Sequence, residues 1–207
     1  MKRFVVAGIG TDVGKTIASA VLTEALQATY WKPVQAGGLD HSDKMTVQKL
    51  AGPDCYVLDE LFRLRTPASP HLAAELDSVN ITLADLELPS LHAHESLVVE
   101  MAGGLLVPLN DDGLLFADVI EGWKLPVMLV TRHYLGSINH TLLSLSELKN
   151  RGITVAGLII SGDRHEPSER IYRKLYPELE FFLLPQLEEL NQHVIAKIGQ
   201  QWREQLG

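Results

Sequence analysis

Residues 4–16 read FVVAGIGTDVGKT, and this stretch decides the fold of the chain. The apolar run at residues 4–7 predicts a buried strand, and the glycine-rich segment after it predicts a loop that opens a helix. Such a loop turns backbone N–H groups inward, where they can hold phosphate groups, and the helix adds the positive end of its dipole. Lys15 can reach the outer phosphates of a nucleotide, and the Thr16 hydroxyl can bind Mg²⁺. The segment therefore predicts a site for a nucleoside triphosphate.

The glycine spacing differs by one residue from the usual motif, in which four residues separate a glycine from Gly-Lys-Ser or Gly-Lys-Thr. Counting back from Gly14 gives Ile9, whereas the glycines are Gly8 and Gly10. The alternative is a glycine turn that ends in Gly-Lys-Thr by chance. We favour phosphate binding because a strand precedes the loop and a helix follows it. The residues expected to contact the nucleotide here are Gly10, Thr11, Asp12, Val13, Gly14, Lys15, Thr16 and Ile17.

Short apolar runs alternate with segments of helical pattern along the whole chain. We expect strands at 3–8, 30–35, 96–101, 126–131, 155–161 and 180–184, and helices at 15–28, 41–51, 70–77, 82–94, 114–122, 137–151, 168–176 and 187–204. Several strands are apolar on both faces, as in parallel sheets that helices cover on both sides. The pattern predicts an α/β fold, a doubly wound, mainly parallel sheet flanked by helices, as in P-loop nucleoside triphosphatases.

The composition narrows the classes of function. A chain of 207 residues with 46% hydrophobic and 21% charged residues predicts one globular domain spanning residues 1–207. The net charge of −8 argues against a nucleic-acid partner. No apolar run approaches the length of a membrane span, and the N-terminus predicts a core strand instead of a signal peptide. We therefore expect a cytoplasmic protein without a membrane partner, in which the single Cys55 is a small buried hydrophobic residue.

Charged residues close two of the predicted strands, at the sheet edge where open α/β proteins bind ligands. Lys32 stands in an apolar strand shortly before a glycine pair, and a buried lysine is usually paired, often with phosphate. Glu100 closes a Leu-Val-Val run, like the carboxylate that holds Mg²⁺ in many ATPases. Asp43 could face the same ion or simply begin a helix. The alternatives for Lys32 and Glu100 are strand-end residues in solvent.

The segment LGSINH at residues 135–140 opens the predicted helix 137–151. Ser137 is a plausible N-cap, and free N–H groups there could bind a carboxylate or phosphate, although an ordinary capped helix fits equally well. His92 and His94, on the predicted helix 82–94, lack metal-ligand spacing and are expected to face solvent. The sequence contains no nucleophile elbow, so we do not expect the chain to catalyse acyl transfer.

Seven segments, taken in order, make the chain resemble the dethiobiotin synthetase family, ATP-dependent enzymes that close the ureido ring late in biotin synthesis. They are residues 8–16, Lys32-Pro33-Val34, Ser42-Asp43, PASPH at 67–71, Glu100 with Ala102-Gly103-Gly104, PLND at 108–111 and LGSINH at 135–140. Each segment alone is weak evidence for this resemblance, but their order and spacing over roughly residues 1–190 are specific to the family.

The resemblance implies a reaction in three steps on 7,8-diaminononanoate. One amine captures CO₂ as a carbamate, ATP phosphorylates the carbamate to a mixed anhydride, and the second amine closes the ring and releases phosphate. It implies that Lys15 and Lys32 are catalytic and neutralise the phosphoryl group and the carbamate, and that Thr16, Asp43 and Glu100 hold Mg²⁺. This chemistry depends on placement and charge and needs no covalent nucleophile.

The resemblance also implies a homodimer, in which the partner subunit holds the carboxylate of the diamine at the start of helix 137–151. A helix N-terminus is a physically suitable carboxylate site. The implied substrate contacts are Thr11, Lys32, Ala36, Ala102, Gly103, Gly136, Ser137, Ile138 and Asn139.

Three residues depart from the family pattern. Met101 replaces a glycine and would add bulk beside the substrate, and Ala36 replaces a common serine and would remove a hydrogen bond. Ser161 stands where the family often has an asparagine that reads adenine, and a hydroxyl cannot supply the paired donor and acceptor of an amide. Pro185 matches a proline near the base. We therefore place Ser161 and Pro185 at the base and leave the base preference open.

Three other functions fit a nucleotide-binding α/β domain. A P-loop ATPase switch of the partition or septum-site type would act on a protein or membrane partner, but such proteins carry an extra lysine where this chain has Gly10, and residues 200–205 are not basic. An amidoligase of the cobyrinate-synthase type usually carries a glutaminase domain, for which this chain is too short. A nucleotide-binding pseudoenzyme is disfavoured by the retained Lys15, Lys32, Asp43 and Glu100.

Overall fold

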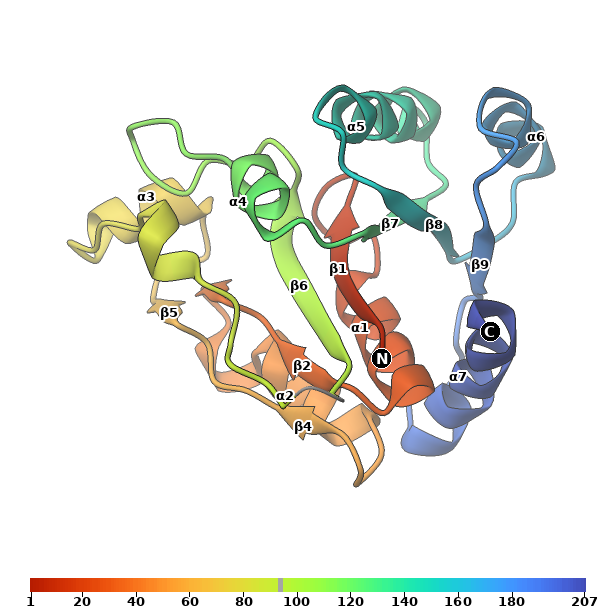
Figure 1. Cartoon of the computed structure of the whole chain (residues 1–207), viewed down its shortest axis with the longest axis horizontal. Coiled ribbons are helices and arrows are strands. Elements are labelled where there is room, and N and C mark those ends of the chain that lie inside the picture. Colours follow the sequence, from red (N-terminus) through yellow and green to blue (C-terminus); the bar gives the residue numbers. More distant parts are fainter. Residues whose placement is uncertain (93–94) are drawn as a thin grey trace.

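The computed structural model describes residues 1–92 and 95–207 (Figure 1). Its main sheet has seven strands, and each neighbouring pair is parallel. In order across the sheet these are β4 (Tyr56–Val57), β2 (Thr29–Trp31), β6 (Leu97–Gly104), β1 (Arg3–Gly8), β7 (Val127–Arg132), β8 (Val155–Ser161) and β9 (Phe181–Leu184). A small parallel pair, β3 (Val34–Ala36) with β5 (Phe62–Leu64), lies apart from it.

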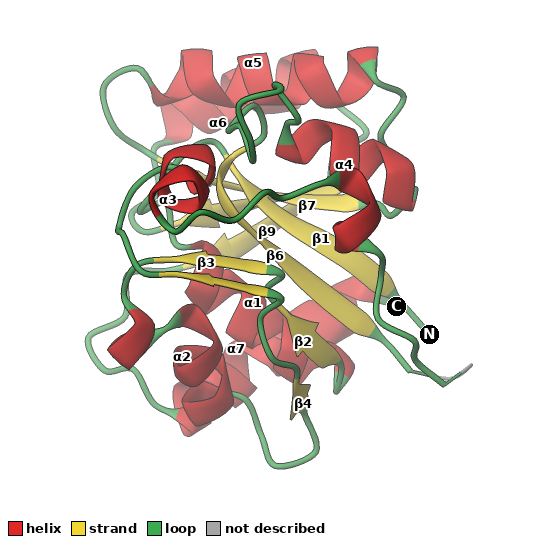
Figure 2. Ribbon diagram, turned by 90° about the vertical axis from the view of Figure 1, so that its left-hand side faces the viewer, coloured by secondary structure: helices red, strands yellow, loops and turns green. Residues whose placement is uncertain are grey.

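Helices cover both faces of the main sheet (Figures 1 and 2). One face carries α1 (Lys15–Leu26), α2 (Asp43–Leu50) and α7 (Gln192–Leu206), and the other carries α4 (Phe116–Trp123), α5 (Ser137–Asn150) and α6 (Glu166–Leu175). Helix α3 (Pro70–Leu76) packs against the small pair, and the short helices η1 (Leu39–His41) and η2 (Leu83–Leu86) lie in connections. The doubly wound parallel sheet predicted from the sequence is confirmed.

Strand β1 lies at the centre of the seven-stranded sheet, and its side chains pack into two separate cores. Phe4 and Val6 pack with the cluster that contains α1 and α7, whereas Val5 and Ala7 pack with the cluster under α4 and α5. The neighbours of β1 are β6 on one side and β7 on the other, and the strand order changes direction at this point. Ligands bind at such a switch point in open α/β sheets, so the loop after β1 is in the expected position.

The predicted strand 30–35 is split into β2 and β3, which belong to different sheets. The break falls at Lys32-Pro33, because proline has no N–H for the sheet and restricts the residue before it. The very short strands β4 and β5 were absent from the predicted set, since two or three residues carry no periodic signal. Cys55 is half-buried, not fully buried as expected.

The predicted helix 82–94 is wrong over its described part, because only η2 (Leu83–Leu86) forms there. The Asp85 carboxylate accepts hydrogen bonds from the backbone N–H and the hydroxyl of Thr82, at 2.9 and 2.6 Å, which closes a single tight turn. Pro89 then prevents the helix from continuing. His92 is exposed, as expected, and the end of the predicted helix with His94 lies outside the described residues.

Candidate active site

The loop after β1 has the backbone that a phosphate site needs. Asp12 and Gly14 both adopt positive φ angles, 55° and 95°, and Gly14 precedes the first residue of α1 without any side-chain cap. The first N–H groups of the helix have no intrahelical acceptor and are available to a ligand. The Lys15 ammonium group donates to the Gly10 carbonyl at 2.6 Å, so this lysine already lies over the loop.

Two glycines of the loop are required sterically. A Cβ atom on Gly8 would lie 2.8 Å from Val13 Cγ2 and 2.9 Å from Lys15 Cδ, and one on Gly14 would clash with the Ser161 hydroxyl. By contrast, apart from its chain neighbours, no heavy atom of the described residues lies within 4 Å of the position of a Cβ on Gly10. Gly8 therefore replaces the glycine that the usual motif has one residue later.

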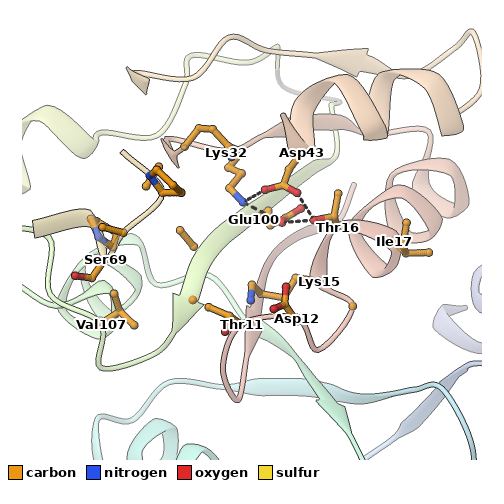
Figure 3. Close-up of a pocket in the computed structure, with 18 of the residues that line it drawn as sticks. Thr11, Asp12, Lys15, Thr16, Ile17, Lys32, Asp43, Ser69, Glu100 and Val107 are labelled. Atoms are coloured by element: carbon orange, nitrogen blue, oxygen red, sulfur yellow. Dashed lines mark hydrogen bonds and ion pairs between the residues drawn. The ribbon is translucent and has the colours of Figure 1, made fainter. Parts of the chain in front are cut away.

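A pocket of about 830 Å³ opens beside this loop, at the carboxyl ends of the strands (Figure 3). Most of the sequence-predicted site residues line it. They are Thr11, Asp12, Gly14, Lys15, Thr16, Ile17, Lys32, Ala36, Asp43, Glu100, Ala102 and Gly103.

Four of these side chains, from α1, α2, β6 and the residue after β2, meet in one cluster (Figure 3). The Thr16 hydroxyl oxygen lies 2.6 Å from Asp43 Oδ1 and 3.0 Å from Glu100 Oε1. The Lys32 ammonium group bridges the same two carboxylates by donating to Asp43 Oδ2 and, at 3.2 Å, to Glu100 Oε1. Tyr30 donates its hydroxyl proton to the second Glu100 oxygen at 2.9 Å. Both sides of the Glu100 carboxylate are therefore held.

Local sequence explains how each side chain reaches the cluster. The break between β2 and β3 at Pro33 lets Lys32 leave the sheet plane, and its side chain is buried to all but 6%. Ser42 caps α2 by accepting a hydrogen bond from Met45 N at 3.4 Å, which makes Asp43 the first helical residue. Asp43 thus begins a helix and also belongs to the cluster.

The charges of the cluster support one another. Burial alone would lower the pKa of Lys32, but Glu100 and Asp43 raise it above its ordinary value. Burial would raise the pKa of Asp43, yet the charge and hydrogen bond of Lys32 bring it below its ordinary value. Burial lowers the pKa of Lys15, and Glu100 only partly offsets this effect. At neutral pH the cluster therefore holds an ionised aspartate and a protonated Lys32.

The cluster offers three oxygen atoms to a hard cation, namely Thr16 Oγ1, Asp43 Oδ1 and Glu100 Oε1. Because the Thr16 hydroxyl has a single proton, it can donate to only one of the two carboxylates it contacts. Oxygen atoms of this kind are the ligands that Mg²⁺ prefers. No group of three or more His, Cys, Asp or Glu side chains in residues 1–92 and 95–207 could hold a metal by itself. A metal here would need further oxygen atoms, such as those of a nucleotide.

Several predicted site residues lie outside this pocket. Gly10 and Val13 belong to the phosphate loop but do not line the pocket. Ser161 and Pro185 do not line the pocket either. Ser161 is the last residue of β8 and packs on Gly14, and Pro185 is exposed just after β9. Met101 is also absent from the pocket, because it alternates with Glu100 along β6 and is 1% exposed in the core. The expected bulk of Met101 beside the substrate is therefore wrong.

The segment Gly136–Asn139 likewise does not line the pocket of its own chain. Gly136, with φ 101°, is the N-cap of α5, so the expected N-cap Ser137 is the first helical residue instead. The Ser137 hydroxyl accepts a hydrogen bond from Tyr134 N at 3.3 Å and is buried. The N-terminus of α5 is thus preceded by a glycine and keeps its first N–H groups uncapped by any side chain.

Sequence reasoning missed some lining residues. Gln35, the segment Pro67–Pro70, Val107 and Arg132 all border the pocket. The segment 67–71 was among the motifs of the resemblance, although no role was assigned to it. Arg132 could have been found as a charged residue that closes an apolar strand. Among the described residues no helix is long and apolar enough to cross a membrane.

Comparison with known proteins gives consistent matches over nearly the whole chain. A family model described as an AAA domain matches residues 2–194. The chain is 48% identical to the ATP-dependent dethiobiotin synthetase of Rhodopseudomonas palustris strain BisB18 over 194 residues, 93% of this chain and 91% of that protein. It is 48% identical to the enzyme of the same name from Agrobacterium fabrum strain C58 (91% and 88% covered) and 43% identical to that from Christiangramia forsetii (99% and 98% covered).

Solved structures share the fold with much lower sequence identity. A Borrelia burgdorferi B31 protein described as a plasmid partition protein, bound to AMPPNP, has a TM-score of 0.63 and 11% identity, with 99% of this chain and 96% of that chain covered. A ParA family ATPase from Chlorobium tepidum TLS has a TM-score of 0.53 and 12% identity, with 98% of each chain covered. These matches show a common fold.

Proposed function

The chain belongs to the ATP-dependent dethiobiotin synthetase family, and we propose that the pocket beside its phosphate loop is where the reaction takes place. The chain is an ATP-dependent ligase that forms dethiobiotin in biotin biosynthesis, acting on small molecules. A partition-type switch shares the fold only, at 11–12% identity, and is not favoured.

The observation that carries the site proposal is the meeting of two lysines and two carboxylates in one pocket. Lys15 enters from the phosphate loop, Lys32 from the end of β2, Asp43 from α2 and Glu100 from β6. In our proposal Lys15 and the loop N–H groups hold the outer phosphates of ATP. Lys32 lies across the pocket, where it neutralises the carbamate oxygens while the phosphoryl group is transferred.

The residues present fit a magnesium ion, and we propose Thr16, Asp43 and Glu100 as its protein ligands. Their oxygen atoms lie within 3.0 Å of the Thr16 hydroxyl, and Lys32 supplies positive charge at the same carboxylates. Bound Mg²⁺ would neutralise charge on the transferring phosphoryl group. The remaining ligands would come from phosphate oxygens and water.

The protein acts on the two amines mainly through its electrostatic environment. Each amine must be neutral to attack, and the cationic Lys15 and Lys32 lower the pKa of an ammonium group placed beside them. Capture of CO₂ releases one proton from the first amine, and ring closure releases one from the second together with phosphate. We propose that Thr11, Ala36, Ala102 and Gly103, which line the pocket, contact the diamine.

We propose a homodimer in which α5 of the partner subunit receives the carboxylate of the diamine through Gly136, Ser137, Ile138 and Asn139. Support comes from exposed apolar side chains around the start of this helix. Leu135 is fully exposed, and Tyr134, Ile138 and Leu143 are 45, 37 and 60% exposed. Apolar residues clustered in this way are typical of interfaces.

The organisation of the whole chain is part of the same proposal. We propose one domain over residues 1–207, with ATP, 7,8-diaminononanoate and CO₂ or bicarbonate as the small-molecule partners. A net charge of −8 supports the absence of a nucleic-acid partner, and a single cysteine supports a reducing, cytoplasmic location. We also propose that the chain has no membrane partner. Ser161 and Pro185 are proposed near the base, and Gly10, Val13 and Ile17 in the nucleotide-binding loop region.

A coupled assay tests the proposed function. The full chain is incubated with the diamine, bicarbonate, Mg²⁺ and ATP, and released phosphate and dethiobiotin are measured. We expect phosphate release to depend on the diamine and to equal dethiobiotin formation. Phosphate release that ignores the diamine but responds to a protein or a membrane would instead favour an ATPase switch.

A further inference from the structure

The order of the strands gives the nucleotide a direction across the sheet. β1 carries the phosphate loop and lies between β6 and β7. Glu100 belongs to β6, Lys32 donates a hydrogen bond to it, and Asp43 pairs with Lys32 on the same side. The outer phosphates belong at this cluster and Lys15. The nucleoside must then extend to the opposite side, over the carboxyl ends of β7, β8 and β9.

Arg132 occupies that opposite side. It is the last residue of β7, pairs with Ser161 of β8 and lines the pocket together with the phosphate loop. Its side chain is exposed, and within the described residues no carboxylate lies at ion-pair distance from it. Lys32, in contrast, is committed to two carboxylates.

The exposed side chain of Arg132 runs along the strand ends. Its Nε and Cγ atoms lie 3.5 and 3.9 Å from the position that a Cβ on Gly162 would take, so the side chain crosses this glycine. Its Nη2 atom lies 3.5 Å from Gln186 Oε1, just after β9. A flat cation therefore covers the end of β8 and reaches toward β9, which is a suitable surface for a planar ring.

Two other polar side chains lie at this position. Ser161 supplies one hydroxyl, and its oxygen packs so closely on Gly14 that this glycine could carry no side chain. The end of β8 therefore carries a hydroxyl in place of an amide with its paired donor and acceptor, and the amide oxygen of Gln186, just after β9, faces Arg132 at 3.5 Å. A guanidinium plane, however, can stack on every nucleobase, because each has a π-face.

We propose that Arg132 holds the nucleobase of the bound triphosphate by stacking, and that the site consequently accepts purine and pyrimidine triphosphates with similar affinity. The direction of the nucleotide rests on the proposed phosphate site, but the stacking interaction does not involve the diamine. Arg132 is thus a binding residue that determines base tolerance, while the loop determines phosphate affinity.

Binding measurements on the full chain with Mg²⁺ test this proposal. Dissociation constants are measured for ATP, GTP, CTP and inorganic tripolyphosphate with the wild type, Arg132→Ala and Arg132→Lys. We expect Arg132→Ala to weaken the three nucleotides by a common factor of about 5 to 30, and tripolyphosphate by less than about twofold. Arg132→Lys keeps the charge but not the plane, so it should remain closer to Arg132→Ala. The control is Arg170→Ala, an exposed arginine of α6, which should change nothing.

Three results would overturn the proposal. Unchanged nucleotide affinity in Arg132→Ala would show that Arg132 does not contact the nucleobase. An equal loss for tripolyphosphate would make Arg132 a phosphate ligand, and a loss confined to one nucleotide would indicate hydrogen-bond reading of that base. A wild type that binds none of the triphosphates would refute the proposed function itself, which is a separate outcome.

Discussion

Replacing Lys32 by glutamine should damage both the stability of the free protein and its turnover, for one electrostatic reason. The Lys32 and Glu100 side chains are 6 and 1% exposed, and Asp43 is 30% exposed. Losing one partner of a buried ion pair costs about 3–5 kcal/mol, and the partial exposure of Asp43 favours the lower end, about 3 kcal/mol. For a chain of this size that corresponds to a decrease in melting temperature of roughly 6–12 °C.

The same change removes a cation from the proposed reaction centre. Loss of one preorganised group that stabilises developing charge typically lowers kcat by about 10² to 10³. The KM for ATP should change much less, because Lys15 and the loop N–H groups remain. Mg²⁺ without nucleotide should restore more stability to Lys32→Gln than to the wild type, since the freed carboxylates can then bind the ion directly.

The assay combines thermal unfolding, with and without Mg²⁺, and steady-state kinetics. Lys44→Gln is the matched control. Lys44 is the second residue of α2, next to Asp43, but it pairs with Asp59, whose side chain is 88% exposed. It should leave the melting temperature nearly unchanged, because an exposed ion pair contributes little to stability. If Lys32→Gln is no less stable than Lys44→Gln, the buried cluster is not the reason for the effect. If turnover and ATP affinity fall by equal factors, Lys32 only helps to hold the nucleotide.

Three further predictions concern other parts of the site. Lys15→Ala should abolish diamine-dependent phosphate release, which the phosphate assay measures. The melting temperature, measured by circular dichroism, should stay unchanged or rise slightly, because burial of the Lys15 ammonium group is unfavourable and lowers its pKa. Lys32 holds the pKa of Asp43 below its ordinary value of 3.8, so the ionised carboxylate stabilises the fold above about pH 4, and this stabilisation is lost as the pH falls further. In urea unfolding between about pH 5 and 3, the free energy of unfolding should therefore decrease less for Lys32→Gln than for the wild type. Leu135→Asp should lower the mass in sedimentation and raise the KM for the diamine but not for ATP, whereas Leu83→Asp, at a position 51% exposed elsewhere, should do neither.

The fold could be predicted largely because buried parallel strands are continuous apolar runs. β1 and β8 occupy the predicted residues, and β7 deviates by one residue at each end. The failures have local causes. Pro33 divides an apolar run into two sheets, and the pattern at 82–94 looked helical although Thr82, Asp85 and Pro89 favour one turn and a stop. Apolar periodicity alone does not weigh these residues.

The site was predictable where a rule connects local sequence to a place in the sheet. Lys15 and Thr16 follow from the loop motif, and Lys32 and Glu100 follow from their positions at strand ends. Met101 could have been corrected at the same stage: if Glu100 points into the pocket, its neighbour in the strand points away. The packing of Ser161 on Gly14 could not be predicted, because it joins residues far apart in the sequence.

The charges of the pocket explain how a protein with a net charge of −8 can accept a triphosphate. Its lining contains three acidic residues, Asp12, Asp43 and Glu100, and three basic residues, Lys15, Lys32 and Arg132. Lys32 is bound to two of the acids, so in the free protein its charge is already compensated. In the proposed mechanism a triphosphate would enter a pocket whose lining charges nearly balance, and a divalent cation at the carboxylates would leave Lys32 to act on the carbamate. The proposal therefore implies an order of events, in which metal and nucleotide would bind before the diamine reacts.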